Sequence, residues 1–159
     1  MDRFMGVDPE GLTAVGRIVV AAGRVEMVLA LVASELGLPN PLRAAGDVVK
    51  DTRRAARKSD PLLAPHSDLV LGWLAKIRAP LEVRHRAVHG VHLTDFSPDG
   101  DRAPVQWLMR SGERMKVDVA EFNETAETLA RLNTEGMNLF GVLHAANFRR
   151  SRRVDLRPE

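Results

Sequence analysis

The sequence of 159 residues contains no cysteine. This absence excludes a disulfide scaffold, a zinc–thiolate site, an iron–sulfur cluster and a cysteine nucleophile. Tyrosine is absent too, and aromatic residues make up only 4%, so few rings are available for stacking nucleic-acid bases. No uncharged run approaches the ~20 residues of a membrane span. The chain does not open with a basic stretch and an apolar run, so we expect no signal peptide, no membrane partner and a cytoplasmic location.

The overall composition is that of an ordinary globular protein. Hydrophobic residues account for 45% and charged residues for 28%, which at this length predicts one domain with its own core. The net charge of +2 is unevenly distributed, because residues 149–159 hold five arginines against two acids. We therefore treat 149–159 as a basic C-terminal tail, and the rest of the chain carries no excess of positive charge.

Helical periodicity predicts long helices over 9–36, 41–58, 67–89 and 118–147. We expect Asp8 to cap the first of them, Gly37 to end it, and Asp118 with Glu121 to form a capping box at the start of the last. Pro80 is expected to kink or divide the third helix. Apolar residues surround almost the whole first helix, which predicts burial on several sides or a dimer face. Its expected core positions are Leu12, Val15, Val19, Ala22, Met27, Ala30, Leu31 and Leu36.

The pattern changes between residues 91 and 118. Val91–Asp95, Val105–Arg110 and Arg114–Val117 resemble short strands separated by turn signals. The sequence thus predicts a mainly α fold: an up-and-down bundle of four to five helices, with a small antiparallel β insertion before the last helix. We assign a single domain to 1–148, with the insertion at about 91–118.

Candidate chemistry concentrates at the end of the third helix. Three of the five histidines fall within eight residues, at His85, His89 and His92. Arg84 precedes His89 with four residues between them, and Gly90 follows. The chain contains no glycine-rich phosphate loop, Walker sequence or serine-nucleophile elbow.

The segment Arg84-His85-Arg86-Ala87-Val88-His89 resembles the Arg-x4-His motif of HEPN domains, small helical domains of prokaryotic toxins, CRISPR effectors and abortive-infection proteins. The polar residue after the arginine and the glycine after the histidine also fit that family. The long first helix is similar as well, and the resemblance covers roughly residues 10–147.

The resemblance implies a metal-independent endoribonuclease of toxin or phage-defence type. Arg84 would stabilise the phosphate, His89 would act as acid or base, and His85 would be the supporting polar residue. Histidine suits this role because its reference pKa of ~6.5 lies near working pH. The two motif residues project about 140° apart on an ideal helix, so the resemblance implies a homodimer with a composite site. RNA and an antitoxin or regulatory protein are the further expected partners, and no metal or cofactor is expected.

Further basic side chains are candidates for contacting RNA phosphates. Five of them lie at helical spacings on the second helix, and one lies in the motif. Glu82 is a candidate for supporting the site, and so is Glu26, which we expect to pair with an arginine, either Arg24 of a partner or one from the motif. The candidate RNA-contacting residues are Arg86, Lys50, Arg53, Arg54, Arg57 and Lys58.

Three other interpretations remain open. The chain could be a non-catalytic HEPN-like dimer that binds RNA or a protein. The histidine cluster could be structural, at a helix end where imidazole meets the helix dipole. Glu82, His85 and His89 could also chelate a metal at offsets of three and four, although Arg84 and Arg86 beside them would repel a cation.

Overall fold

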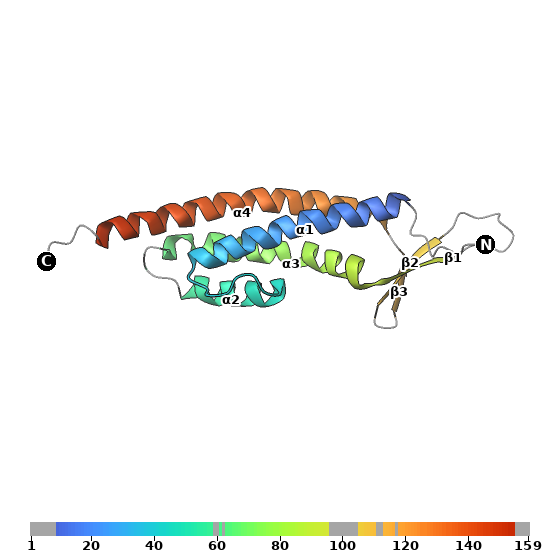
Figure 1. Cartoon of the computed structure of the whole chain (residues 1–159), viewed down its shortest axis with the longest axis horizontal. Coiled ribbons are helices and arrows are strands. Elements are labelled where there is room, and N and C mark those ends of the chain that lie inside the picture. The colour runs from blue at the N-terminus through green and yellow to red at the C-terminus, as the bar shows by residue number, and fades with distance from the viewer. Residues whose placement is uncertain are drawn as a thin grey trace.

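Four stretches of the chain form α-helices that pack along one another in the computed structural model (Figure 1). The structure describes residues 9–58, 61, 63–95, 105–110, 113–116 and 118–154. Within these residues the mainly α class is confirmed. A short 3-10 turn, η1 (Ala64–His66), leads into the third helix. The four helices are α1 (Pro9–Glu35), α2 (Ala45–Arg57), α3 (Ser67–His89) and α4 (Val119–Val154).

The first and last helices lie side by side and run in the same direction (Figure 1). The expected up-and-down order is therefore wrong, because the first and last of four helices run in opposite directions in such a bundle. Arg17 of α1 donates a hydrogen bond to Asn123 of α4 at 3.2 Å. Eighteen residues further along α1, the side chain of Asn147 donates to the backbone oxygen of Glu35 at 2.8 Å. The third helix runs the opposite way against α4, since Trp73 contacts the middle of α4 and Arg86 reaches its first turn at Glu121.

The core lies between α1, α3 and α4, with α2 packed against α1 and α3. The observed core differs in part from the core face expected for α1. Leu12, Val19 and Met27 are exposed, whereas Ala22 and Ala30 are buried as expected. Leu69 of α3 is exposed as well. The core side chains of α1 are Ala14, Ile18, Ala22, Val25, Val28, Leu29, Val32 and Ala33.

A three-stranded antiparallel sheet connects α3 to α4. Its strands are β1 (Val91–Asp95), β2 (Val105–Arg110) and β3 (Glu113–Lys116), in the order β1-β2-β3. Within the register, Leu93 pairs with Trp107, and Met109 pairs with Arg114. The sheet lies beyond the end of α3 that carries His89 (Figure 1).

The ends of the helices follow local rules in most places. Gly37 ends α1 with φ at 79°, and the amide of Leu38 donates to the oxygen of Ala33 at 3.1 Å, which confirms the glycine cap. The amide of Glu121 donates to Oδ1 of Asp118 at 3.0 Å, which confirms the aspartate as the cap of α4. The expected cap at Asp8 lies outside the described residues.

Of the two effects expected of Pro80, division of the third helix is wrong, because α3 is a single helix from Ser67 to His89 with Pro80 inside it. The last helix does not end at Asn147 but continues to Val154, into the segment treated as a tail. Arginine is a good helix former and is favourable near a helix C-terminus, which explains the continuation. None of the helices in the described ranges is long and apolar enough to cross a membrane.

Candidate functional site: a basic cleft with two histidines

One face of α3 carries four ionisable side chains at offsets of four, three and four residues: Arg78, Glu82, His85 and His89. At 3.6 residues per turn, these offsets keep all four on one side of the helix. They line one wall of a cleft with a volume of about 870 Å³. Arg84 projects about 140° away from His89 around the helix, and its side chain still lines the same cleft. Both residues of the Arg-x4-His motif therefore contribute to one cleft of a single chain.

The opposite wall comes from α2 and the loop before it. Lys50 and Arg53 project from α2, Arg43 comes from the loop, and Glu26 of α1 contributes from a third direction. The cleft is therefore strongly basic, because five arginine and lysine side chains face only two carboxylates. The cations are Arg43, Lys50, Arg53, Arg78 and Arg84, and the carboxylates are those of Glu26 and Glu82. A concave surface with this balance attracts polyanions.

The arginine of the motif is paired with α1. Its Nη2 lies 3.8 Å from Oε1 of Glu26, and the two side chains are 26% and 31% exposed. Of the two partners considered for Glu26, the motif arginine is the one that the structure supplies. The Nε of Arg84 is buried and has no hydrogen-bond partner. The pair orients the guanidinium at the junction of α1 and α3 and leaves part of it open to the cleft.

The two motif histidines touch each other. The ring centroids of His85 and His89 are 4.5 Å apart, with the planes inclined by 51°. His85 is half-buried and His89 is exposed, so a substrate in the cleft can reach both rings. Across the described part of the chain, no group of three or more histidine, aspartate or glutamate side chains is arranged to hold a metal ion. Glu82, His85 and His89 thus do not form the chelating group considered as an alternative.

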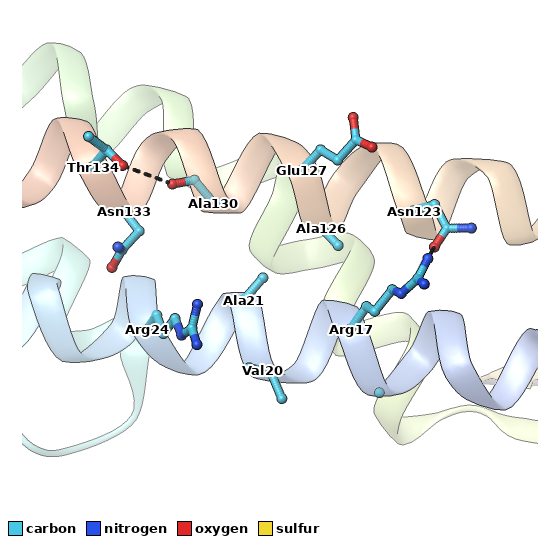
Figure 2. A pocket seen from close by; sticks show the side chains of 11 residues that line it. Arg17, Val20, Ala21, Arg24, Asn123, Ala126, Glu127, Ala130, Asn133 and Thr134 are labelled. Atoms are coloured by element: carbon cyan, nitrogen blue, oxygen red, sulfur yellow. Dashed lines mark hydrogen bonds between the residues drawn. The ribbon is translucent and has the colours of Figure 1, made fainter.

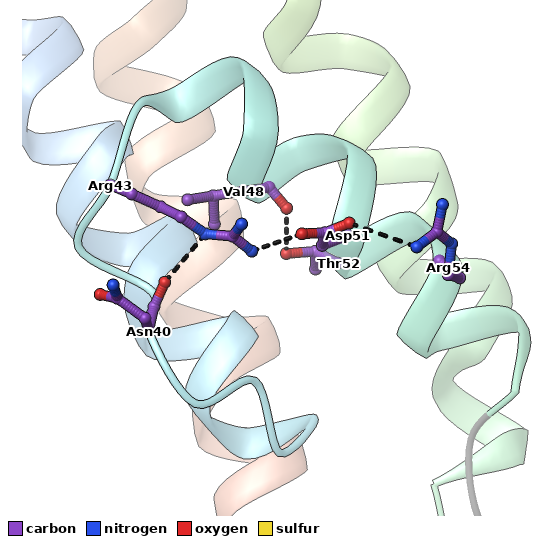
Figure 3. Close-up of polar contacts among 6 residues, drawn as sticks. All are labelled: Asn40, Arg43, Val48, Asp51, Thr52 and Arg54. Atoms are coloured by element: carbon purple, nitrogen blue, oxygen red, sulfur yellow. Dashed lines mark hydrogen bonds and ion pairs between the residues drawn. The ribbon is translucent and has the colours of Figure 1, made fainter.

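Polar contacts fix the start of the α2 wall (Figure 3). The Nε of Arg43 donates to the backbone oxygen of Asn40 at 3.1 Å, and its Nη2 forms an ion pair with Asp51. Asp51 also lies 3.7 Å from Nη1 of Arg54. The hydroxyl of Thr52, which is buried, donates to the oxygen of Val48 at 2.6 Å. The guanidinium of Arg43 is therefore a fixed part of the cleft rather than a freely moving cation.

The structure divides the candidate RNA-contacting residues into two groups. Lys50 and Arg53 line the cleft, whereas Arg54, Arg57 and Lys58 do not. Arg86 also lies outside the cleft, because it turns to α4 and its Nη2 donates to Oε1 of Glu121 at 2.9 Å. The basic side chains of α2 cover a wider part of the helix surface than the cleft wall does, so only some of them face the cleft.

Two cationic lining residues, Arg78 and Arg43, are not among the candidates from the sequence. Arg78 had a detectable signal, because it lies on the same helical face as His85 and His89, seven and eleven residues before them. Arg43 had none, because it enters the cleft from a loop that only the packing of α2 against α3 brings close.

Comparison of the chain with protein-family models, with curated proteins and with solved structures found no match. The fold and the site together define a helical bundle with a basic cleft that carries two adjacent histidines.

Proposed function

We propose that this protein is a metal-independent endoribonuclease of toxin or phage-defence type that acts on RNA bound in the basic cleft. One observation carries the proposal: Arg84, His85 and His89 line the same cleft as Lys50 and Arg53. Cations on both walls suit a phosphodiester backbone, and imidazole suits proton transfer at neutral pH.

The proposed reaction needs no group beyond the side chains and the RNA. The 2′-oxygen attacks the adjacent phosphorus and forms a new P–O bond, and the bond to the 5′-oxygen of the next nucleotide breaks. A base takes the proton of the 2′-hydroxyl, and an acid protonates the leaving 5′-oxygen. The products are a 2′,3′-cyclic phosphate and a 5′-hydroxyl. His89 is assigned to proton transfer, which is typically worth 10²–10⁴-fold in rate.

The other motif residues support this step. Arg84 would place a fixed positive charge against the crowded phosphate, where charge develops in the transition state. Glu26 holds that guanidinium at 3.8 Å and so sets its direction. His85 touches the ring of His89 and would fix its orientation. As the HEPN resemblance implies, two subunits would act on the same RNA, and an antitoxin or regulatory protein would restrain the activity in the cell.

The decisive experiment is cleavage of total bacterial RNA by the full chain in EDTA, followed by analysis of the new ends. We expect the wild type to leave 2′,3′-cyclic phosphates and His89→Ala to lose at least 100-fold in rate. His66→Ala is the matched control, because His66 lies in η1 and does not line the cleft.

Two results would overturn the proposal. Equal cleavage by wild type and His89→Ala would assign the activity to a contaminant or to other residues. Absence of cleavage by a folded wild type, with salt-dependent RNA binding retained, would establish the non-catalytic RNA-binding module instead.

A further inference from the structure

The outward face of α1 is apolar and uncovered. Leu12, Val20 and Met27 are 62%, 57% and 56% exposed, and Val19 is exposed too. Two exposed glycines lie among them, and no charged side chain interrupts the face. It extends about 22 Å along the helix at 1.5 Å per residue. Its members are Leu12, Gly16, Val19, Val20, Gly23 and Met27, and together they are called the α1 face below. Continuous exposed apolar surface of this kind marks an interaction site.

The α1 face has a symmetric order of side-chain sizes. Counted inward from either end, it presents a large residue, a glycine and a valine. In two antiparallel copies related by a two-fold axis between Val19 and Val20, Leu12 lies opposite the partner's Met27, and Gly16 lies opposite the partner's Gly23. Every small residue then meets a small one, and every large residue meets a large one. An isologous dimer requires this self-complementarity.

The glycines of the face are not explained by the packing of the chain itself. A Cβ added to Gly16 or to Gly23 would meet nothing within 4 Å. Glycine in a helix interior lowers helix stability relative to alanine, so its presence at both positions needs another reason. Close approach of a second helix backbone provides one, because glycine lets helix axes come near each other.

Charged residues beside the face are complementary under the same symmetry. Arg17 and Arg24 of α1 and Glu127 of α4 line a groove of about 700 Å³ between the two helices (Figure 2). The two-fold axis places the α4 helices of both copies on the same side of the dimer. In this register the partner's Arg17 reaches the level of Ala22, two residues from Arg24 in the same groove. Glu127 is the carboxylate of that groove, and it can pair with both guanidinium groups where the two copies meet.

We infer that two copies of this chain associate through the α1 face, with their α1 helices antiparallel. The inference rests on the homodimer in the proposed function, but it does not require that the cleft cleave RNA. Glu26 lies on the opposite edge of α1 from Arg17 and lines the basic cleft. Both clefts therefore open on one side of the dimer, with the two Glu26 residues about 20 Å apart along the helix axis. One RNA strand can then contact both subunits.

The test measures the mass of the full chain in solution by light scattering and by sedimentation. We expect the wild type at twice the 17.5 kDa chain mass. Val20→Glu should raise the dimer dissociation constant at least 100-fold, because it places a charge at the two-fold axis. Leu69→Glu is the matched control: its side chain is 58% exposed on α3, away from the α1 face, and this variant should remain dimeric.

Further variants test the close approach and the register. Gly23→Ala should fold at least as well as the wild type, since its Cβ meets nothing in the chain, yet weaken association about tenfold. Glu127→Arg should weaken association, because it leaves only cations in the groove, and adding Arg17→Glu to it should restore association.

A monomeric wild type at 100 µM, or a Val20→Glu variant as dimeric as the wild type, would overturn the inference. RNA cleavage is measured on the same samples. Dimer formation without cleavage would remove the ribonuclease proposal and keep this interface, whereas cleavage by a monomeric wild type would do the reverse.

Discussion

Gly136 of α4 lies against the indole of Trp73 of α3 so closely that an added Cβ would be 2.5 Å from the ring atom Cζ2. It would also lie 2.6 Å from Cγ1 of Val28. Real Cβ atoms do not come so near, so the three central helices pack here only because Gly136 has no side chain. Glycine is a poor helix former, but at position 136 the packing of the core requires it.

Gly136→Ala should therefore destabilise the fold, although alanine is the better helix former. Overpacking of this kind typically costs about 1–3 kcal/mol. Gly141→Ala is the control, because a Cβ there meets nothing within 4 Å, and it should stabilise the protein by up to about 1 kcal/mol. Urea denaturation followed by circular dichroism measures both free energies of unfolding. Equal effects of the two substitutions would contradict this account.

Trp73→Phe should lower the free energy of unfolding by about 1–3 kcal/mol. The indole is buried, and its Nε1 donates to the backbone oxygen of Leu132 at 2.9 Å. Phenylalanine loses this donor and leaves unfilled space between α3 and α4. Leu69→Ala, at an exposed position of the same helix, should change stability by less than about 0.5 kcal/mol. Chemical denaturation of both variants checks the prediction, and a Trp73→Phe protein as stable as the wild type would refute it.

The basic residues of α2 should differ in their effect on RNA binding. Lys50→Ala and Arg53→Ala remove cations from the cleft wall, whereas Arg57→Ala and Lys58→Ala remove cations outside it. Each cleft substitution should reduce the slope of log affinity against log salt concentration by about 0.7, the value for one single-strand phosphate contact. Fluorescence anisotropy with labelled RNA over a range of KCl concentrations measures these slopes. Equal losses from all four variants would mean that RNA follows the whole helix face instead.

Glu26→Gln should separate binding from catalysis. It removes one of the two carboxylates of the cleft, so RNA should bind no more weakly than to the wild type. It also removes the charge that holds Arg84, so we expect kcat to fall about tenfold, with KM unchanged or lower. The pair is partly exposed at 3.8 Å, and stability should change by less than about 1 kcal/mol. Steady-state kinetics and thermal unfolding check the two parts, and an unchanged kcat would show that Arg84 needs no partner.

The sequence predicts the positions of the helices well because their signals are local. Proline, glycine and aspartate mark the ends of α1 and the start of α4 at or near the observed residues. The sequence predicts the buried face of α1 less well. When apolar residues surround a helix, periodicity no longer distinguishes core from surface, and so Leu12, Val19 and Met27 were assigned to the wrong side.

The candidate site shows the same division between local and distant information. The Arg-x4-His spacing draws attention to Arg84 and His89 because both lie on one short segment. The sequence offers Glu26 a motif arginine as one of two partners, and the packing of α1 against α3 selects Arg84. Arg43 enters the cleft from the loop before α2, and no sequence pattern indicates it, because it meets α3 only through tertiary packing. Arg86 lies outside the cleft because it forms an ion pair with Glu121 of α4, which is also a consequence of tertiary packing.

The parallel pairing of α1 with α4 determines when the protein can complete its core. The contacts that join these helices link residues 106 to 112 positions apart in the sequence. Non-local contacts of this range slow folding, because a long loop must close before they form. During synthesis, α1, α2 and α3 leave the ribosome with the α4-facing side of the core still open to water. The nascent chain depends on its last helix for a closed core, and until then its apolar surface is available to chaperones.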